Sequence, residues 1–322
     1  MEKGEHAMER EQARTLTPEV ISNLTVQSVA NIPSLADVFV HSMKGKTAIV
    51  TGGATGLGYN VTNRLAEAGA NVVIASRSPQ KGEKAEKEFR EKGYEVSFCP
   101  TDVTDVEACR RAVAFAEKKY GKVDILVANA ATWSMYSYLD MPEEEFDAVL
   151  NCDLKGEYFM GQAAARSMVK NKVQGKIIFI ASTARKGCDV NGVAMMTHYN
   201  AAKGAISSMT IGIAKELKQY GISVNCVAPG GMLSTGTITN TAKLGALYGP
   251  EALADRSKYS AESPTTMNPD EVALVVFGMC TPMSNFMSGE TVDVNGGVQL
   301  SYQKQPWSYT VEGCKPGPQK NG

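Results

Sequence analysis

The stretch Thr51-Gly52-Gly53-Ala54-Thr55-Gly56-Leu57-Gly58 decides how this chain folds. It follows an apolar run, Thr47–Val50, that predicts a buried strand, and it precedes a segment with helical periodicity. A glycine-rich turn between strand and helix lets the backbone approach a pyrophosphate, whose charge sits on free N–H groups at the helix N-terminus. The Gly-x-x-x-Gly-x-Gly spacing is not that of a Walker loop. We therefore predict a dinucleotide site at Gly52, Thr55, Gly56, Leu57 and Gly58, with a purely structural turn as the alternative.

From Gly45 onward, strand-length apolar runs alternate with longer amphipathic stretches. Continuous rather than alternating apolar runs indicate strands buried on both faces, with the helices as crossovers. This pattern predicts an α/β fold: a Rossmann-type, doubly wound parallel sheet of about seven strands in a single domain. The predicted strands are Thr47–Val50, Asn71–Ser76, Glu95–Cys99, Asp124–Ala128, Lys176–Ala181, Ser223–Val227 and Glu290–Val294, and the predicted helices are Asn60–Ala68, Lys81–Glu91, Val106–Lys119, Glu143–Val169, Thr197–Leu217 and Pro269–Met279.

The ends of the chain do not share this alternation, so we divide it into an N-terminal extension (1–43), a catalytic domain (44–298) and a C-terminal tail (299–322). Two short helices are predicted in the extension, beginning near Thr17 and Ser34. Their apolar faces favour docking of residues 15–43 onto the domain or onto a neighbouring subunit. Residues 1–14 are interpreted as a solvated leader.

Composition excludes several classes of protein. Lys and Arg number 33 against 34 Asp and Glu, a net charge of −1, which argues against nucleic acid as a partner. The apolar runs are too short to span a bilayer, and the charged N-terminus has no secretory apolar region. Seven cysteines without C-x-x-C spacing, and three histidines without ligand spacing, predict neither a disulfide framework nor a metal site. We expect a cytoplasmic protein with no membrane partner.

The end of the second predicted strand bears on cofactor choice. NAD sites usually place a carboxylate there to hold the adenosine ribose, but this chain has Ser76, followed by Arg77 and Ser78. A guanidinium suits the 2′-phosphate of NADP through charge-assisted hydrogen bonds. The sequence favours NADP(H), and NAD(H) stays open.

A reactive group is predicted past the midpoint of the chain. Tyr199 and Lys203 are four residues apart, which places a phenol and an ammonium on one helix face, and Ser182 ends a buried strand just upstream. A free tyrosine has a pKa of about 10, and a nearby ammonium should lower it. Ser182 would then hold the reacting oxygen while Tyr199 gives or takes its proton.

With these motifs in view, the chain resembles the classical short-chain dehydrogenase/reductase family over Lys44 to Val298. Asp293-Val294-Asn295-Gly296-Gly297 is similar to its terminal strand signature. The resemblance implies interconversion of a ketone and a secondary alcohol by hydride transfer, with Lys203 also on the nicotinamide ribose, and a homodimer or homotetramer. Further cofactor contacts implied by the resemblance are Asp102, Val103, Asn129, Ala130, Ala131, Tyr199, Pro229, Gly230, Met232 and Ser234.

Two features depart from that pattern. The family's fourth catalytic residue is an Asn, and its place here falls on Asp153, with Asn151 as a misaligned substitute. The segment between Ser182 and Tyr199 is longer than the family usually shows, and its extra residues, Cys188, Asn191, Met195 and Met196, are expected to border the substrate pocket. His198 is disfavoured as a base because adjacent helical residues point about 100° apart.

Large flexible side chains are predicted around the pocket. Trp133, Met195 and Met232, together with Ser182, are the expected substrate contacts, and methionine and aromatic groups adapt to bulky apolar ligands. This wall is similar to that of bacterial hydroxysteroid dehydrogenases, the 20β type among them, and so implies a steroid-like substrate. The alternatives are a 2,4-dienoyl-CoA reductase, a sugar or polyol dehydrogenase, and a dinucleotide-sensing scaffold without activity.

Overall fold

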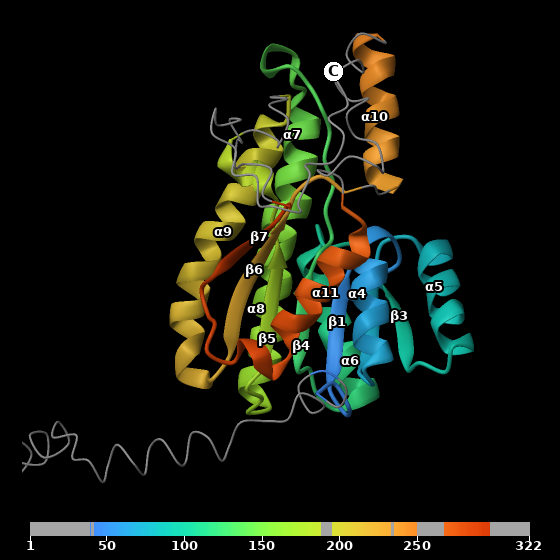
Figure 1. The fold of residues 1–322 in the computed structure, drawn as a ribbon, viewed down its shortest axis with the longest axis vertical. Helices are drawn as coiled ribbons and strands as arrows, with labels where there is room; N and C mark the ends of the chain where they lie inside the picture. The colour runs from blue at the N-terminus through green and yellow to red at the C-terminus, as the bar shows by residue number, and fades with distance from the viewer. Residues whose placement is uncertain (1–38, 40–41, 188–194, 233–234, 250–266, 297–322) are drawn as a thin grey trace, which may run out of the picture.

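A seven-stranded parallel sheet forms the centre of the computed structural model, in the order β3-β2-β1-β4-β5-β6-β7 (Figure 1). The structure describes residues 39, 42–187, 195–232, 235–249 and 267–296. The order reverses direction between β1 and β4, which is where open α/β sheets bind their ligands. The strands are β1 (Thr47–Thr51), β2 (Asn71–Ser76), β3 (Val96–Pro100), β4 (Ile125–Ala128), β5 (Lys176–Ile180), β6 (Ser223–Pro229) and β7 (Thr291–Val294).

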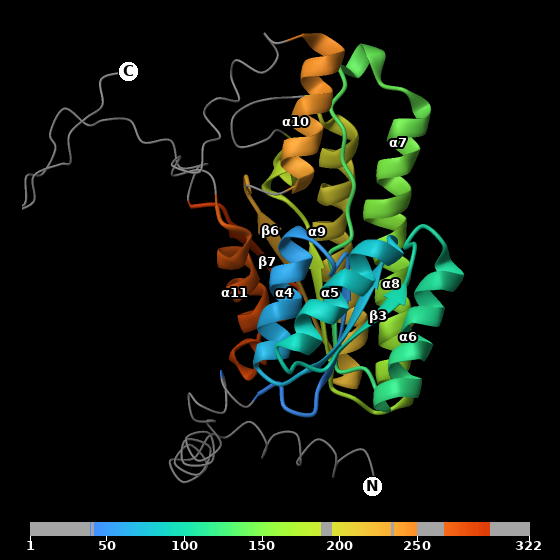
Figure 2. The same cartoon turned by 90° about the vertical axis from the view of Figure 1, so that its right-hand side faces the viewer.

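Helices cover both faces of this sheet (Figures 1 and 2). On one face, α4 packs against α11, and α5 packs against β3; on the other, α6 packs against α8, and α9 packs against β6. The helices are α4 (Gly56–Glu67), α5 (Pro79–Glu91), α6 (Val106–Tyr120), α7 (Glu143–Val149), α8 (Glu157–Lys170), α9 (Thr197–Leu217), α10 (Thr235–Tyr248) and α11 (Pro269–Cys280), with 3₁₀ turns at Tyr138–Asp140, Thr183–Lys186, Lys218–Tyr220 and Pro282–Ser284.

Two apolar clusters, one on each face, hold the layers together. The residues of β1 divide between them, since Ile49 packs into one cluster and Ala48 and Val50 pack into the other. All of these side chains are fully buried. The continuous apolar runs of the sequence are therefore the two-sided burial that a doubly wound parallel sheet requires.

The predicted fold class is confirmed, with one break inside a predicted helix. The segment Glu143–Val169 is not continuous: α7 ends at Val149, a π-helical stretch η2 covers Leu150–Gly156, and α8 follows. A π-helical stretch rotates the residues around it relative to a regular helix and is frequent at functional sites. Asp153 lies inside it.

Helix α10 was not predicted from the sequence. It stands with α7 beyond the carboxyl ends of the strands (Figures 1 and 2). The helices expected in the N-terminal extension, and the C-terminal tail, lie outside the described residues. Within the described part of the chain, no helix has both the length and the apolar character needed to cross a membrane.

Candidate active site

The glycine-rich turn brings backbone to backbone too closely for any side chain. A Cβ at Gly58 would lie 2.6 Å from Asn129 Nδ2 and would also collide with the Gly52 carbonyl oxygen. Gly52 and Gly56 have φ of +64° and +56°, a conformation that L-residues rarely adopt. Thr55 is the N-cap of α4 and its side chain makes no capping hydrogen bond, so the first N–H groups of α4 face outward. The turn fits a pyrophosphate.

Residues at the end of β4 hold this turn in place. The backbone N–H groups of Asn129 and Ala130 donate to Thr51 Oγ1 at 2.7 and 2.8 Å, and Asn129 Nδ2 donates to the Thr51 carbonyl at 2.9 Å. Thr51 therefore ties β4 to the end of β1. These bonds give Asn129 a structural role beside the expected cofactor contact.

The residues predicted to hold the adenosine ribose lie at and just after the end of β2. The Ser76 hydroxyl is buried and makes no hydrogen bond within the described residues, whereas Arg77 is exposed and Ser78 is the N-cap of α5. Asp102 accepts hydrogen bonds from Thr104 N and Oγ1 at 3.0 and 2.8 Å. A buried, unsatisfied hydroxyl beside a free guanidinium is a suitable donor set for a phosphorylated ribose.

Ser182, Tyr199 and Lys203 face one cavity of about 260 Å³ that continues to the glycine turn. Ser182 follows β5, and Tyr199 and Lys203 lie one helical turn apart on α9. The Ser182 hydroxyl donates to the Pro229 carbonyl at 3.4 Å. The cavity is lined by Gly52, Thr55, Gly56, Leu57, Asn129, Ala130, Ala131, Trp133, Ile180, Ala181, Ser182, Tyr199, Lys203, Pro229, Gly230 and Met232.

Three protein groups contact the Lys203 ammonium, which is only 1% exposed; two accept a hydrogen bond from it, and Asp153 forms an ion pair with it. They are the Ile180 carbonyl at 2.9 Å, Asp153 Oδ2 at 3.2 Å and Glu157 Oε1 at 3.3 Å. The ammonium also lies 5.7 Å from the centre of the Tyr199 ring. These contacts fix the position of a long flexible side chain and keep its pKa raised.

Asp153, placed at the family's Asn position by the sequence, lies at the site. It is fully buried, and its Oδ1 accepts the Thr132 backbone N–H at 2.7 Å. Asn151 is exposed and does not substitute for it. Glu157, one turn further along, was missed by the sequence analysis. The sequence feature that could have indicated it is a glutamate in the same predicted helix as Asp153, since that helix was expected to pack against the sheet.

The balance of charges raises the pKa of Tyr199, contrary to the expected depression. Burial is the largest cause, and the Asp153 and Glu157 carboxylates act in the same direction. The Lys203 ammonium and the Ser182 hydroxyl oppose the rise without cancelling it. The reason is that Asp153, paired with Lys203, neutralises much of the ammonium charge. In the protein alone, Tyr199 therefore stays protonated at neutral pH.

An apolar cluster lies beside Trp133 and Tyr199, two residues that line the cavity. Met135, Met196 and Leu244 make a buried cluster, against which Trp133, Met195 and Tyr199 pack. His198 is buried, its Nε2 lies 3.0 Å from Ser134 Oγ, and burial lowers its pKa. His198 is therefore engaged with Ser134 and does not act as the catalytic base. Cys188, Asn191 and Ser234 lie outside the described residues.

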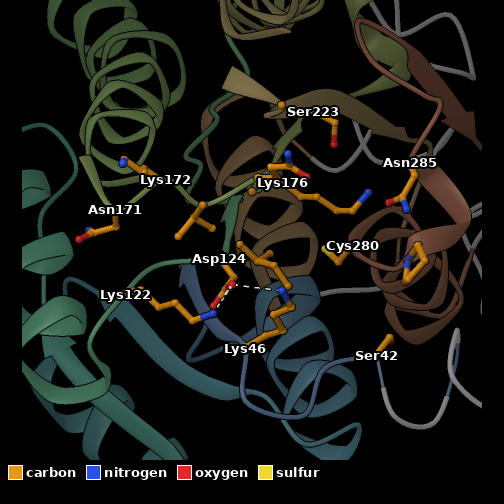
Figure 3. A pocket seen from close by; sticks show the side chains of 16 residues that line it. Ser42, Lys46, Lys122, Asp124, Asn171, Lys172, Lys176, Ser223, Cys280 and Asn285 are labelled. Atoms are coloured by element: carbon orange, nitrogen blue, oxygen red, sulfur yellow. Dashed lines mark hydrogen bonds and ion pairs between the residues drawn. The ribbon is translucent and has the colours of Figure 1, made fainter. Parts of the chain in front are cut away.

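A second pocket, of about 730 Å³, lies at the opposite edge of the sheet, where the strands begin (Figure 3). Lys46 and Lys122 converge there on Asp124 at 3.3 and 3.0 Å, and Lys176 donates to Ser284 at 2.8 Å. Asp124 also accepts the Thr47 backbone N–H at 2.9 Å. These ion pairs tie β1 to β4, and no group predicted for catalysis is near them.

The arrangement of these residues at the carboxyl ends of the strands agrees with comparisons to known proteins. The family model for short chain dehydrogenases matches residues 46–244. This chain belongs to the short-chain dehydrogenase family. The (S)-acetoin-forming diacetyl reductase of Staphylococcus epidermidis is 31% identical over 79% of this chain and 98% of its own.

Two further similarities extend over most of the domain. The L-rhamnose 1-dehydrogenase (NAD(P)(+)) of Azotobacter vinelandii is 31% identical over 80% of this short-chain dehydrogenase and 98% of its own chain. A short-chain type dehydrogenase/reductase from Mycobacterium marinum has a crystal structure that superposes with a TM-score of 0.73, at 29% identity, covering 83% of this chain and all of its own. The chain is thus an oxidoreductase of this family.

Proposed function

We propose that this short-chain dehydrogenase reduces an apolar ketone to a secondary alcohol, and catalyses the reverse reaction, with NADP(H). The observation that carries the proposal is the single cavity shared by the glycine turn, Ser182, Tyr199 and Lys203. A nicotinamide dinucleotide bound along this cavity supplies or accepts the hydride. The residues present fit it, because the turn is open to the cavity at Gly56, where a Cβ would meet no protein atom within 4 Å, and Ser76 offers an unsatisfied hydroxyl.

The side chains have separate parts in the proton transfer. Ser182 donates a hydrogen bond to the carbonyl oxygen and orients it. Tyr199, protonated at neutral pH, gives its proton to that oxygen as negative charge develops there. The Lys203 ammonium lies 5.7 Å from the centre of the Tyr199 ring, and its positive charge stabilises the phenolate that forms.

The cofactor preference rests on Arg77. It is exposed at the end of β2, beside the buried Ser76 hydroxyl, and no carboxylate occupies the position that accepts ribose hydroxyls in NAD sites. A guanidinium at that place attracts a 2′-phosphate. We infer that NADP(H) binds more tightly than NAD(H).

The substrate preference rests on the described wall of the pocket. Its large apolar side chains include Trp133 and Met232, Trp133 packs against the apolar cluster of Met135, Met196 and Leu244, and Ser134 is already engaged by His198. A polyol needs several polar partners to replace its lost water, whereas an apolar ketone needs only the two groups that hold its oxygen. This favours an apolar ketone over a sugar, with steroid ketones as bulky members of that class.

Nicotinamide absorbance tests the proposal. The enzyme is mixed with NADPH or NADH and a panel of ketones: an aliphatic diketone, a cyclic ketone, a steroid ketone, a sugar and a 2,4-dienoyl-CoA. We expect the highest kcat/KM with NADPH and an apolar ketone. Turnover of the dienoyl-CoA or the sugar alone would overturn the substrate class, and turnover of none would support a dinucleotide-sensing scaffold.

A further inference from the structure

Three almost fully buried ionisable side chains lie together at the cavity, one of which, Lys203, lines it. Lys203, Asp153 and Glu157 are 1%, 0% and 2% exposed, and the ammonium lies 3.2 Å and 3.3 Å from the two carboxyl groups. With both carboxyls ionised, this cluster would carry an uncompensated negative charge. A buried charge without a partner is strongly unfavourable, and the group takes up a proton instead. One of the two carboxyls therefore holds a proton.

The contacts of the four carboxyl oxygens decide which carboxyl that is. Both Asp153 oxygens have a contact suited to a carboxylate: Oδ1 accepts the Thr132 N–H at 2.7 Å, and Oδ2 lies 3.2 Å from the Lys203 ammonium in an ion pair, without a hydrogen bond. Glu157 has one such contact, through Oε1, and its Oε2 is buried with neither a hydrogen bond nor an ion pair in the described structure. An unpaired carboxylate oxygen is less favourable there than a carboxylic acid. Glu157 holds the proton.

No other described group supplies a compensating charge. The titratable neighbours are Tyr199 and Lys203 from α9, Cys152 and Asp153 from η2, and Cys226 from β6. Burial raises the pKa of Cys226 to about 11 and that of Cys152 to about 12, so both thiols are neutral. Burial likewise raises the pKa of Glu157 well above its usual range.

We propose that Glu157 is the internal proton donor that recharges Lys203 after each reduction. The inference rests on the proposed carbonyl chemistry. Nothing in the family pattern quoted above calls for an acid at this position. What points to it is the neutral carboxylic acid 3.3 Å from Lys203, on the side of the ammonium that is shielded from solvent.

The proton balance of one reduction is as follows. The Tyr199 O–H bond breaks and its proton joins the oxygen of the carbonyl that receives the hydride, giving the alcohol and a phenolate. The phenolate regains a proton from the Lys203 ammonium, which becomes an amine. The amine takes the proton of Glu157, which becomes a carboxylate. A proton that enters from solvent through the cavity lined by Lys203 then restores the acid, and in alcohol oxidation each transfer runs backwards.

Glu157→Gln isolates the transferable proton. The amide has the size and neutrality of the acid and still accepts from Lys203, so NADPH affinity and the first turnover, which uses the proton already on Tyr199, should stay within about twofold of wild type. We expect the steady-state kcat of reduction to fall about tenfold or more, because later turnovers need Tyr199 to be reprotonated. The control, Glu91→Gln on α5, alters an exposed glutamate and should change neither quantity. A steady-state kcat of Glu157→Gln within about twofold of wild type would overturn the proposal.

An infrared measurement without substrate gives an independent result. At pH 7 the wild-type enzyme should show the C=O band of a buried carboxylic acid, which Glu157→Gln loses and Glu91→Gln keeps. A wild type without the band, or a band that persists in Glu157→Gln, would place the proton elsewhere and reject the assignment. If no ketone is reduced by the wild type but the band behaves as expected, the proposed function fails while the protonation of Glu157 stands.

Discussion

Lys203 and Asp153 form an ion pair of 3.2 Å in which neither side chain is more than 1% exposed. In this short-chain dehydrogenase the pair joins α9 to the π-helical stretch η2, and so joins the helix that holds the reactive phenol to a segment beside the cavity. A buried pair responds to the loss of one partner far more than a surface pair does, because the remaining charge has no water to solvate it. Several of the expected outcomes below follow from this.

Tyr199→Phe removes the proton donor and keeps the ring. We expect turnover to be lost, with a fall of about 10²–10⁴ in kcat, the range typical of general acid catalysis. NADPH affinity should be nearly intact, since the ring still packs against the wall. Stopped-flow absorbance and fluorescence titration of NADPH measure the two quantities. A near-normal reduction rate would show that another group supplies the proton.

Lys203→Ala leaves Asp153 and Glu157 buried without a cation. One of them must take up a further proton or the fold must open, so we expect a loss of about 3–5 kcal/mol in the free energy of unfolding. Turnover and NADPH affinity should fall as well. Urea unfolding and NADPH titration test this, with Lys87→Ala, an exposed lysine of α5, as the control. An unchanged unfolding midpoint would mean that the two carboxyls do not depend on the ammonium.

Asp153→Asn combined with Glu157→Gln removes both carboxyls from Lys203. The Asp153 carboxylate raises the pKa of Tyr199, and Glu157 would do the same once ionised, so removing both groups should lower that pKa. Alcohol oxidation needs the phenolate, and its rate should therefore rise at a lower pH than in wild type, while ketone reduction should decline at a lower pH. Asp153→Asn alone should shift the profiles less, because Glu157 can then ionise beside Lys203. Profiles of kcat/KM against pH in both directions measure the shift, and a move to higher pH would contradict the expectation.

Arg77→Ala should weaken NADPH binding by about 1.5–3 kcal/mol, the contribution of a hydrogen bond to a charged group. NADH has no 2′-phosphate, so its affinity should hardly change. Titrations of both cofactors against wild type and variant give the comparison. If the wild-type enzyme prefers NADH, Arg77 does not reach the ribose, and Ser76 is left as the contact to the 2′-hydroxyl.

Gly58→Ala should abolish dinucleotide binding. The added methyl group would lie 2.6 Å from Asn129 Nδ2 and against the Gly52 carbonyl, so the turn must change shape. Gly212→Ala is a matched control, because a Cβ at that exposed position of α9 meets no atom within 4 Å. It should keep cofactor affinity and stabilise the helix by up to about 1 kcal/mol. Normal NADPH affinity in Gly58→Ala would argue that the turn is structural only.

Sequence reasoning came closest where the physical signal is local. The predicted strand Asn71–Ser76 has the observed bounds, and the predicted helix Thr197–Leu217 matches α9. An unbroken apolar run and a helical periodicity both depend on residues that are neighbours in the sequence. It failed at the predicted helix Glu143–Val169. The π-helical stretch in its middle keeps the apolar spacing nearly intact, so no residue in that segment indicates the departure from a regular α-helix.

The sequence by itself determined the layered α/β fold, the glycine turn and the spacing of Tyr199 and Lys203. Each depends on residues close together in the chain, or on burial that composition reveals. Tertiary structure alone decided the charge state around Lys203. Glu157 is 46 residues away in sequence and reaches the ammonium only because α8 and α9 pack on the same face of the sheet. Burial at that contact removes the water that would otherwise screen the three charges, and it turns an ordinary glutamate into an acid beside the active site.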